Sequence, residues 1–133
     1  MTQITTQLTI WTPRMLSILR IVAAILFFEH GTQKLFAFPV PYPNGAPAMM
    51  SLLWFAAILE LVGGALLLVG LFTRCVAFVL SGQMAVAYLL AHAPRGPFPV
   101  TNGGDAAILF CFVFLYLAAA GGGAWSIDAA RKK

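Results

Sequence analysis

Charged side chains are scarce in this chain of 133 residues. Asp, Glu, Lys and Arg together make up 9% of it, whereas about a quarter of the residues are charged in soluble domains. Apolar residues account for 61% of the chain, and its mean hydropathy is +0.91. This composition excludes an ordinary soluble domain and predicts an integral membrane protein surrounded by a lipid bilayer.

Cysteine and histidine are equally scarce, which narrows the chemistry that the chain can perform alone. Cys75 and Cys111 fall at different predicted depths and form no C-x-x-C pair, so thiol exchange by this chain has little support. Histidines and carboxylates show no paired spacing on one helix, so we expect no metal site. No glycine-rich loop for cradling phosphate is present. We therefore expect no intrinsic cofactor.

Apolar residues gather in segments separated by proline and glycine. Four segments are evident, at residues 15–38, 51–72, 74–93 and 105–123. A helical span needs about 20 residues, and the fourth segment reaches that length only if the glycines after residue 120 are counted. Proline-rich stretches, which cannot propagate a helix, separate the first segment from the second and the third from the fourth. We expect a single all-α domain, a four-helix transmembrane bundle, with the first span retained as an anchor.

Basic residues are concentrated on one side of these predicted spans. That side holds Arg14, Arg74, Arg131, Lys132 and Lys133, whereas the proline-rich loops hold only Arg95. Because lysine and arginine near span ends are retained in the cytoplasm, we expect both termini to be cytoplasmic and both proline-rich loops to lie outside. In a bacterium this indicates a multi-pass protein of the inner membrane. The net charge of +4 thus indicates topology and not nucleic-acid binding.

Polar side chains inside the apolar segments or just beside them are the candidates for a functional site, because charges there are costly and usually face a protein interior or a wet cavity. They are Arg20, Glu29, His30, Lys34, Glu60, Gln83, Asn102 and Asp105. Helical geometry places Arg20, His30 and Lys34 within an arc of roughly 80° on one face of the first span. Equal depth near the outer boundary predicts an ion pair between Lys34 and Asp105. Together these residues would form a polar column inside the bundle.

Each candidate also has a purely structural interpretation. Ion pairs that set the register of the helices would explain Arg20, Lys34, Glu60 and Asp105 without a ligand. Lys34 could instead extend to the lipid headgroups. His30 is expected to hydrogen-bond a neighbouring helix. Glu29 points away from the main polar face, toward a partner subunit.

Five motifs along the chain resemble the DoxX family of small bacterial membrane proteins. They are His30-Gly31-x-x-Lys34, Glu60-x-x-Gly63-Gly64 with Gly70, Arg74, Asn102-x-Gly104-Asp105 and Ser126-Ile127-Asp128. The resemblance covers nearly the whole chain and implies a four-helix membrane protein. In some relatives the family name is attached to a subunit of a thiosulfate:quinone oxidoreductase, and others are linked to oxidative-stress defence. The chain has Asp105 where the family more often has Glu, which shortens the reach of that carboxylate toward Lys34.

Our leading functional hypothesis is a membrane subunit of a respiratory or redox complex that is not catalytic alone. It would dock partner membrane proteins or further copies of itself, and line a quinone site with His30, Glu29 and Glu60. Four aromatic residues are expected to pack on the quinone ring: Phe27, Phe28, Phe36 and Trp54. The alternatives are a small proton or solute transporter that uses the polar column, and a purely structural subunit.

Overall fold

Every regular element that the computed structural model describes, over residues 2–132, is helical. The long helices are α1 (Thr2–Phe36), α2 (Leu52–Val69), α3 (Thr73–Ala87) and α5 (Asp105–Ala120). Shorter elements are a π-helical turn (Tyr88–His92), a 3₁₀ turn (Ala93–Arg95), α4 (Pro99–Asn102) and α6 (Ile127–Ala130). The prediction of an all-α chain is confirmed for these residues.

Three helical stretches are long and apolar enough to cross a membrane: Gln3–Phe36, Leu52–Val69 and Thr73–Arg95. The third joins α3 to the two turns that follow it. The fourth predicted span is shorter than expected, because α5 ends at Ala120, where Gly121 adopts a positive φ of 90°. Its 16 residues extend about 24 Å, less than the roughly 30 Å of a hydrocarbon core.

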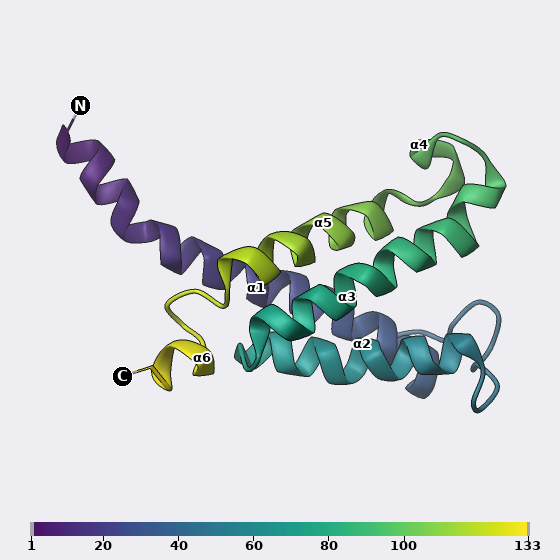
Figure 1. The fold of residues 1–133 in the computed structure, drawn as a ribbon. Helices are drawn as coiled ribbons and strands as arrows, with labels where there is room; N and C mark the ends of the chain where they lie inside the picture. Colours follow the sequence, from purple (N-terminus) through teal and green to yellow (C-terminus); the bar gives the residue numbers. More distant parts are fainter. Residues whose placement is uncertain (1, 133) are drawn as a thin grey trace.

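Helix α1 begins at Thr2, thirteen residues before the predicted start of the first span at residue 15. Pro13 lies inside the helix instead of preceding it. Proline removes one backbone amide but keeps the φ that a helix requires, and the carbonyl left without its donor, that of Thr9, belongs to an exposed residue. The N-terminal part of α1 extends away from the other helices in Figure 1. The predicted helix boundary at Pro13 is therefore wrong, because the helix continues through this proline on an exposed stretch of α1.

The long helices pack as two pairs, α1 with α2 and α3 with α5, joined by contacts between α2 and α3. Figure 1 shows both termini and the α2–α3 turn at one end of the molecule, which we call the terminal end. The two proline-rich connections lie at the opposite end, which we call the loop end. Gly31 and Gly64 allow the first pair to approach closely, since a Cβ on Gly31 would lie 2.9 Å from the Leu61 amide and one on Gly64 3.1 Å from the Phe28 Cα.

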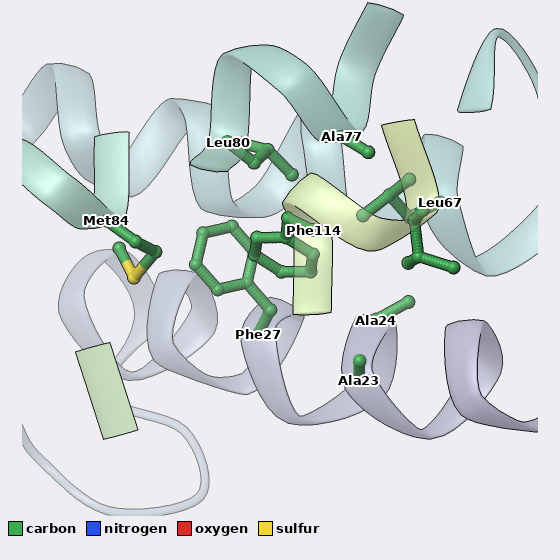
Figure 2. Packing of buried hydrophobic residues seen from close by; sticks show 9 residues of the cluster. Ala23, Ala24, Phe27, Leu67, Ala77, Leu80, Met84 and Phe114 are labelled. Carbon is green, nitrogen blue, oxygen red and sulfur yellow. The ribbon is translucent and has the colours of Figure 1, made fainter. Parts of the chain in front are cut away.

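The hydrophobic core lies between the two pairs. Figure 2 shows Phe27 of α1 against Phe114 of α5, whose ring centroids are 4.9 Å apart in an edge-to-face arrangement. Leu67 of α2 and Leu80 of α3 close this layer, and all four side chains are at most 1% exposed. The outer surface of the helices is rich in exposed leucine, valine and phenylalanine.

Candidate functional site

A cavity of about 710 Å³ opens between α1, α2, α3 and α5 on the loop-end side of the core. Its walls are mainly apolar, and include Phe27, Leu53, Phe55, Leu59, Met84 and Phe110. Four candidate site residues also line it: His30, Lys34, Glu60 and Gln83. An apolar cavity with a few convergent polar groups is the usual form of a small-molecule site.

The strongest polar contact in this cavity joins α1 to α2. Lys34 Nζ donates to Glu60 Oε1 over 2.5 Å, and the two side chains are only 11% and 4% exposed. The predicted pair between Lys34 and Asp105 is therefore wrong. Depth alone did not identify the partner, because α1 packs along α2 and meets α5 much less. Asp105 is exposed at the start of α5 and does not line the cavity.

Two oxygen atoms at this site lack a hydrogen-bond donor within residues 2–132. They are Glu60 Oε2 and Gln83 Oε1, and both are buried. The amide nitrogen of Gln83 is occupied, since it donates to the Ala56 carbonyl over 3.2 Å. Buried acceptors without a donor are costly, by about 1–3 kcal/mol each, so this pair of oxygens is suited to a ligand that supplies hydrogen-bond donors.

His30 lines the edge of the cavity and is exposed. Its Nδ1 is 2.7 Å from the carbonyl of Leu26 in the same helix, so the expected hydrogen bond to a neighbouring helix is wrong. Contact with α5 comes instead from the Phe110 ring, 6.0 Å away between centroids. Because Nδ1 is held by the backbone carbonyl, Nε2 is the nitrogen left to meet a ligand.

Two further candidates, Asn102 and Glu29, do not line the cavity. Asn102 is the buried last residue of α4. Its side-chain amide donates to the Gly96 carbonyl over 2.9 Å, and its side-chain oxygen accepts from the Gly104 amide over 2.8 Å. These bonds shape the connection between α3 and α5, so Asn102 supports the wall of the cavity and does not line it. Glu29 is exposed and does not line the cavity. The predicted cluster of His30, Glu29 and Glu60 thus loses one member.

Arg20 forms a second polar centre, near the terminal end. It is fully buried, and its guanidinium donates to backbone carbonyls of Leu67 (2.5 Å), Leu68 (2.8 Å), Gly122 (2.9 Å) and Trp125 (2.5 Å). Leu67 and Leu68 lie in the last turn of α2, where carbonyls lack helical donors and the helix dipole is negative. Arg20 therefore joins α1 to the end of α2 and to the glycine-rich loop after α5.

Side chains also hydrogen-bond the free backbone groups of two other helix ends at the same end of the molecule. Arg74 donates to the carbonyls of Ala118, Ala119 and Ala120 at the end of α5. Asp128 accepts the amides of Phe72 and Thr73 at the start of α3, over 2.9 and 2.8 Å. Burial of the Asp128 carboxylate raises its pKa, but these hydrogen bonds and the nearby charge of Arg131 lower the pKa by more.

The two polar centres do not form a column within the described residues. Arg20 and Lys34 are about 21 Å apart along α1. Phe27 lies between them on α1, and Phe114 of α5 packs against it, as Figure 2 shows. The predicted continuous polar column is wrong, because side chains on one face of α1 meet different helices at different heights. The loop-end centre has a cavity suited to a ligand, whereas the Arg20 centre is completed by backbone.

Sequence reasoning also missed several residues of the cavity. Of the four aromatic residues expected to pack on a ligand, Phe27 lines it, whereas Phe28, Phe36 and Trp54 do not. The other aromatic walls come from Tyr42, Phe55, His92 and Phe110. Tyr42 could have been predicted, because it is an aromatic residue in the proline-rich loop that follows α1. Its ring centroid lies 6.0 Å from Lys34 Nζ.

Comparisons with known proteins agree with this description. The sequence profile of the DoxX family matches residues 15–93, which is more than half of the chain. A protein of Haemophilus influenzae, named "Uncharacterized protein", is 44% identical over 120 residues, covering 87% of this chain and 90% of that relative. No solved structure matches. The profile match and the three helices long enough for a bilayer lead to one conclusion: the chain is a membrane protein of the DoxX family.

Proposed function

We propose that this protein is a non-catalytic membrane subunit of a quinone-linked redox complex in the bacterial inner membrane. Its loop-end cavity would hold the quinone head, and a partner subunit would carry the redox centre. The observation that carries the proposal is the pair of buried oxygens, Glu60 Oε2 and Gln83 Oε1, beside apolar and aromatic walls. A quinol has hydroxyl groups that donate to such acceptors, and its ring and tail suit the apolar walls.

The chemistry of the cavity favours the reduced form of the ligand. The oxidised quinone offers only acceptors, which satisfy neither Glu60 Oε2 nor Gln83 Oε1. Lys34 Nζ and His30 Nε2 are able to donate to either form. Each additional hydrogen bond contributes about 1 kcal/mol, so the quinol should bind about fivefold or more tightly than the quinone.

A binding experiment tests this proposal directly. The protein in lipid nanodiscs is titrated with the reduced and oxidised forms of a short-chain quinone, with protein-free nanodiscs as the blank. Glu60→Gln and Gln83→Leu should each abolish most of the preference for the quinol. Glu29→Gln is the matched control, because it makes the same chemical change at an exposed residue outside the cavity. Equal partitioning of both forms in all proteins, no greater than in the blank, would overturn the proposal.

The transporter alternative receives less support from the packing. A path for protons or solutes needs a polar or wet route along the helices. The buried layer around Phe27 and Phe114 interrupts such a route within residues 2–132. Ion or proton flux through proteoliposomes that exceeds the protein-free rate would favour this alternative over the quinone subunit.

We also propose that both termini are cytoplasmic and that α5 serves as a fourth span, with local bilayer thinning accommodating its short length. Cys75 is exposed at the terminal end, close to the basic residues that indicate the cytoplasmic side. A membrane-impermeant maleimide should label it in inverted vesicles and not in intact cells. Arg95→Cys in a Cys75→Ala background should show the opposite labelling, and labelling of Cys75 from outside would refute this topology.

A further inference from the structure

A second cavity, of about 550 Å³, lies at the terminal end of the molecule, apart from the quinone cavity proposed above. The start of α3, the glycine-rich loop after α5, and α6 with the residues that follow it form its walls. Its charged residues are three basic side chains and one carboxylate: Arg74, Arg131, Lys132 and Asp128. The cavity is thus positively charged on balance.

The basic side chains of this cavity outnumber its one carboxylate, Asp128, which lies near enough to Arg131 for that charge to lower its pKa. The carboxylate oxygens of Asp128 each accept a backbone amide, from Phe72 and Thr73. Arg74 uses its guanidinium on the carbonyls at the end of α5. Arg131 lies over the Phe72 ring, with 5.5 Å from its Cζ to the centroid, and Lys132 is exposed. Within residues 2–132, none of the three makes an ion pair, so the cluster is suited to an added anion.

Exposed apolar side chains place this cavity at the boundary between hydrocarbon and water. Phe72, which lines the cavity beneath Arg131, is 56% exposed. Trp125, which directly precedes the cavity residue Ser126, is 52% exposed. Tryptophan side chains such as that of Trp125 are enriched at the headgroup level of a membrane. Lipid phosphates lie at the same level, and clusters of basic residues there attract anionic lipids.

We propose that this cavity binds the phosphate group of an anionic phospholipid, with Arg131 and Lys132 as its cationic contacts. Arg74 and the α3–α6 contacts hold the cavity walls in place. The lipid is favoured over a free phosphate ion because Phe72 and Trp125 offer an apolar surface where its glycerol and acyl groups would lie. Each basic residue near a membrane surface adds about fivefold to the affinity for anionic lipid.

Quenching of Trp125 fluorescence by brominated lipids provides the test. The full chain carries Trp11→Phe and Trp54→Phe, so that Trp125 is the reporter, and is reconstituted with brominated phosphatidylglycerol or brominated phosphatidylcholine at equal mole fraction. Phosphatidylglycerol should quench more strongly. The double variant R131Q/K132Q should lose most of this preference, by about 25-fold in relative affinity. Arg95→Gln, at the loop end and outside the cavity, should retain it.

Three results would overturn the proposal. One is equal quenching by the two lipids in the unaltered cavity. Another is full retention of the preference in R131Q/K132Q. The third is loss of the lipid preference when inorganic phosphate is added, with no loss when sodium chloride is added at the same ionic strength. That result would assign the site to the free phosphate ion. A preference that survives inorganic phosphate supports the lipid.

Discussion

Arg20 offers the sharpest test of how this fold is held together. Replacing it by Met keeps a long flexible side chain but removes every hydrogen bond that the guanidinium makes. Two of the four carbonyls keep another donor, since Leu67 O also accepts the Gly70 amide and Gly122 O the Ser17 hydroxyl. The other two, on Leu68 and Trp125, lose the donor shown for them.

The expected loss of stability follows from those two carbonyls. Both of these hydrogen bonds are only partly buried, since Leu68 is 37% exposed and Trp125 is 52% exposed. The loss of each donor therefore costs about 1 kcal/mol, the low end of the range for an unpaired acceptor, or about 2 kcal/mol together. Removing the buried charge recovers part of its desolvation penalty. We therefore expect Arg20→Met to lower the free energy of unfolding by about 1–2 kcal/mol. Arg20→Lys should lie between the two, because one ammonium reaches fewer carbonyls.

Unfolding in mixed micelles titrated with sodium dodecyl sulfate, followed by circular dichroism, measures this difference. Arg14→Met is the matched control, since Arg14 lies on the same helix but contacts only the face of Trp11 among the contacts described for it. Its effect should stay within about 0.5 kcal/mol. Arg20→Met that unfolds at the same detergent fraction as the parent would refute the role assigned to these hydrogen bonds.

Three further predictions concern other contacts and use the same unfolding titration. Lys34→Met leaves the buried Glu60 carboxylate unpaired and should cost about 3–5 kcal/mol, whereas K34M/E60L should recover most of that; equal stabilities of the two variants would contradict the ion pair. Asp128→Ala should cost about 1 kcal/mol at neutral pH, because two amides at the start of α3 lose their acceptor. Folding lowers the pKa of Asp128, so its contribution to stability is complete above the unfolded pKa of about 3.9 and disappears as the pH falls through the folded pKa. A difference in the free energy of unfolding between parent and variant that grows on acidification would refute this role. Gly123→Ala should cost about 1–3 kcal/mol, because Gly123 has a φ of 79° and the new Cβ would lie 2.6 Å from the Pro13 carbonyl oxygen.

Gly82 provides the control for the glycine prediction. A Cβ added there meets nothing within 4 Å, and its residue lies inside α3. Alanine favours a helix over glycine by about 0.5–1 kcal/mol, so Gly82→Ala should leave stability unchanged or raise it. A similar loss for both substitutions would show that the tight contact around Gly123 is not the cause.

Most of the fold could be predicted from the composition and from the proline, glycine and capping residues that lie at helix ends. The first helix ends at Phe36, shortly before the loop that begins with Pro39, and the third helical stretch ends in the 3₁₀ turn that contains Pro94. Ser51 caps the start of α2 by accepting the Trp54 amide, and Gly70 ends it with a positive φ. These are local effects, which depend on residues near one another in the chain. Pro13 is the exception, since whether a proline interrupts a helix depends on what its freed carbonyl meets.

The candidate site could be predicted only in part. Residue type identified His30, Lys34, Glu60 and Gln83, because polar groups in apolar segments turn inward. The partner of Lys34 could not be found from depth, since the choice between Glu60 and Asp105 depends on which helices are neighbours.

The amino-acid sequence by itself determined that this protein lies in a lipid bilayer and that it is helical. In a bilayer the backbone must form its hydrogen bonds within the protein, and a helix does so within each apolar segment. Only the tertiary structure decided that Arg20 would donate to carbonyls at the end of α2 and that Lys34 would pair with Glu60. It also decided that apolar side chains would separate these two polar centres. The physical reason is that a helix face presents its side chains at different heights, and each height meets whichever helix packs beside it.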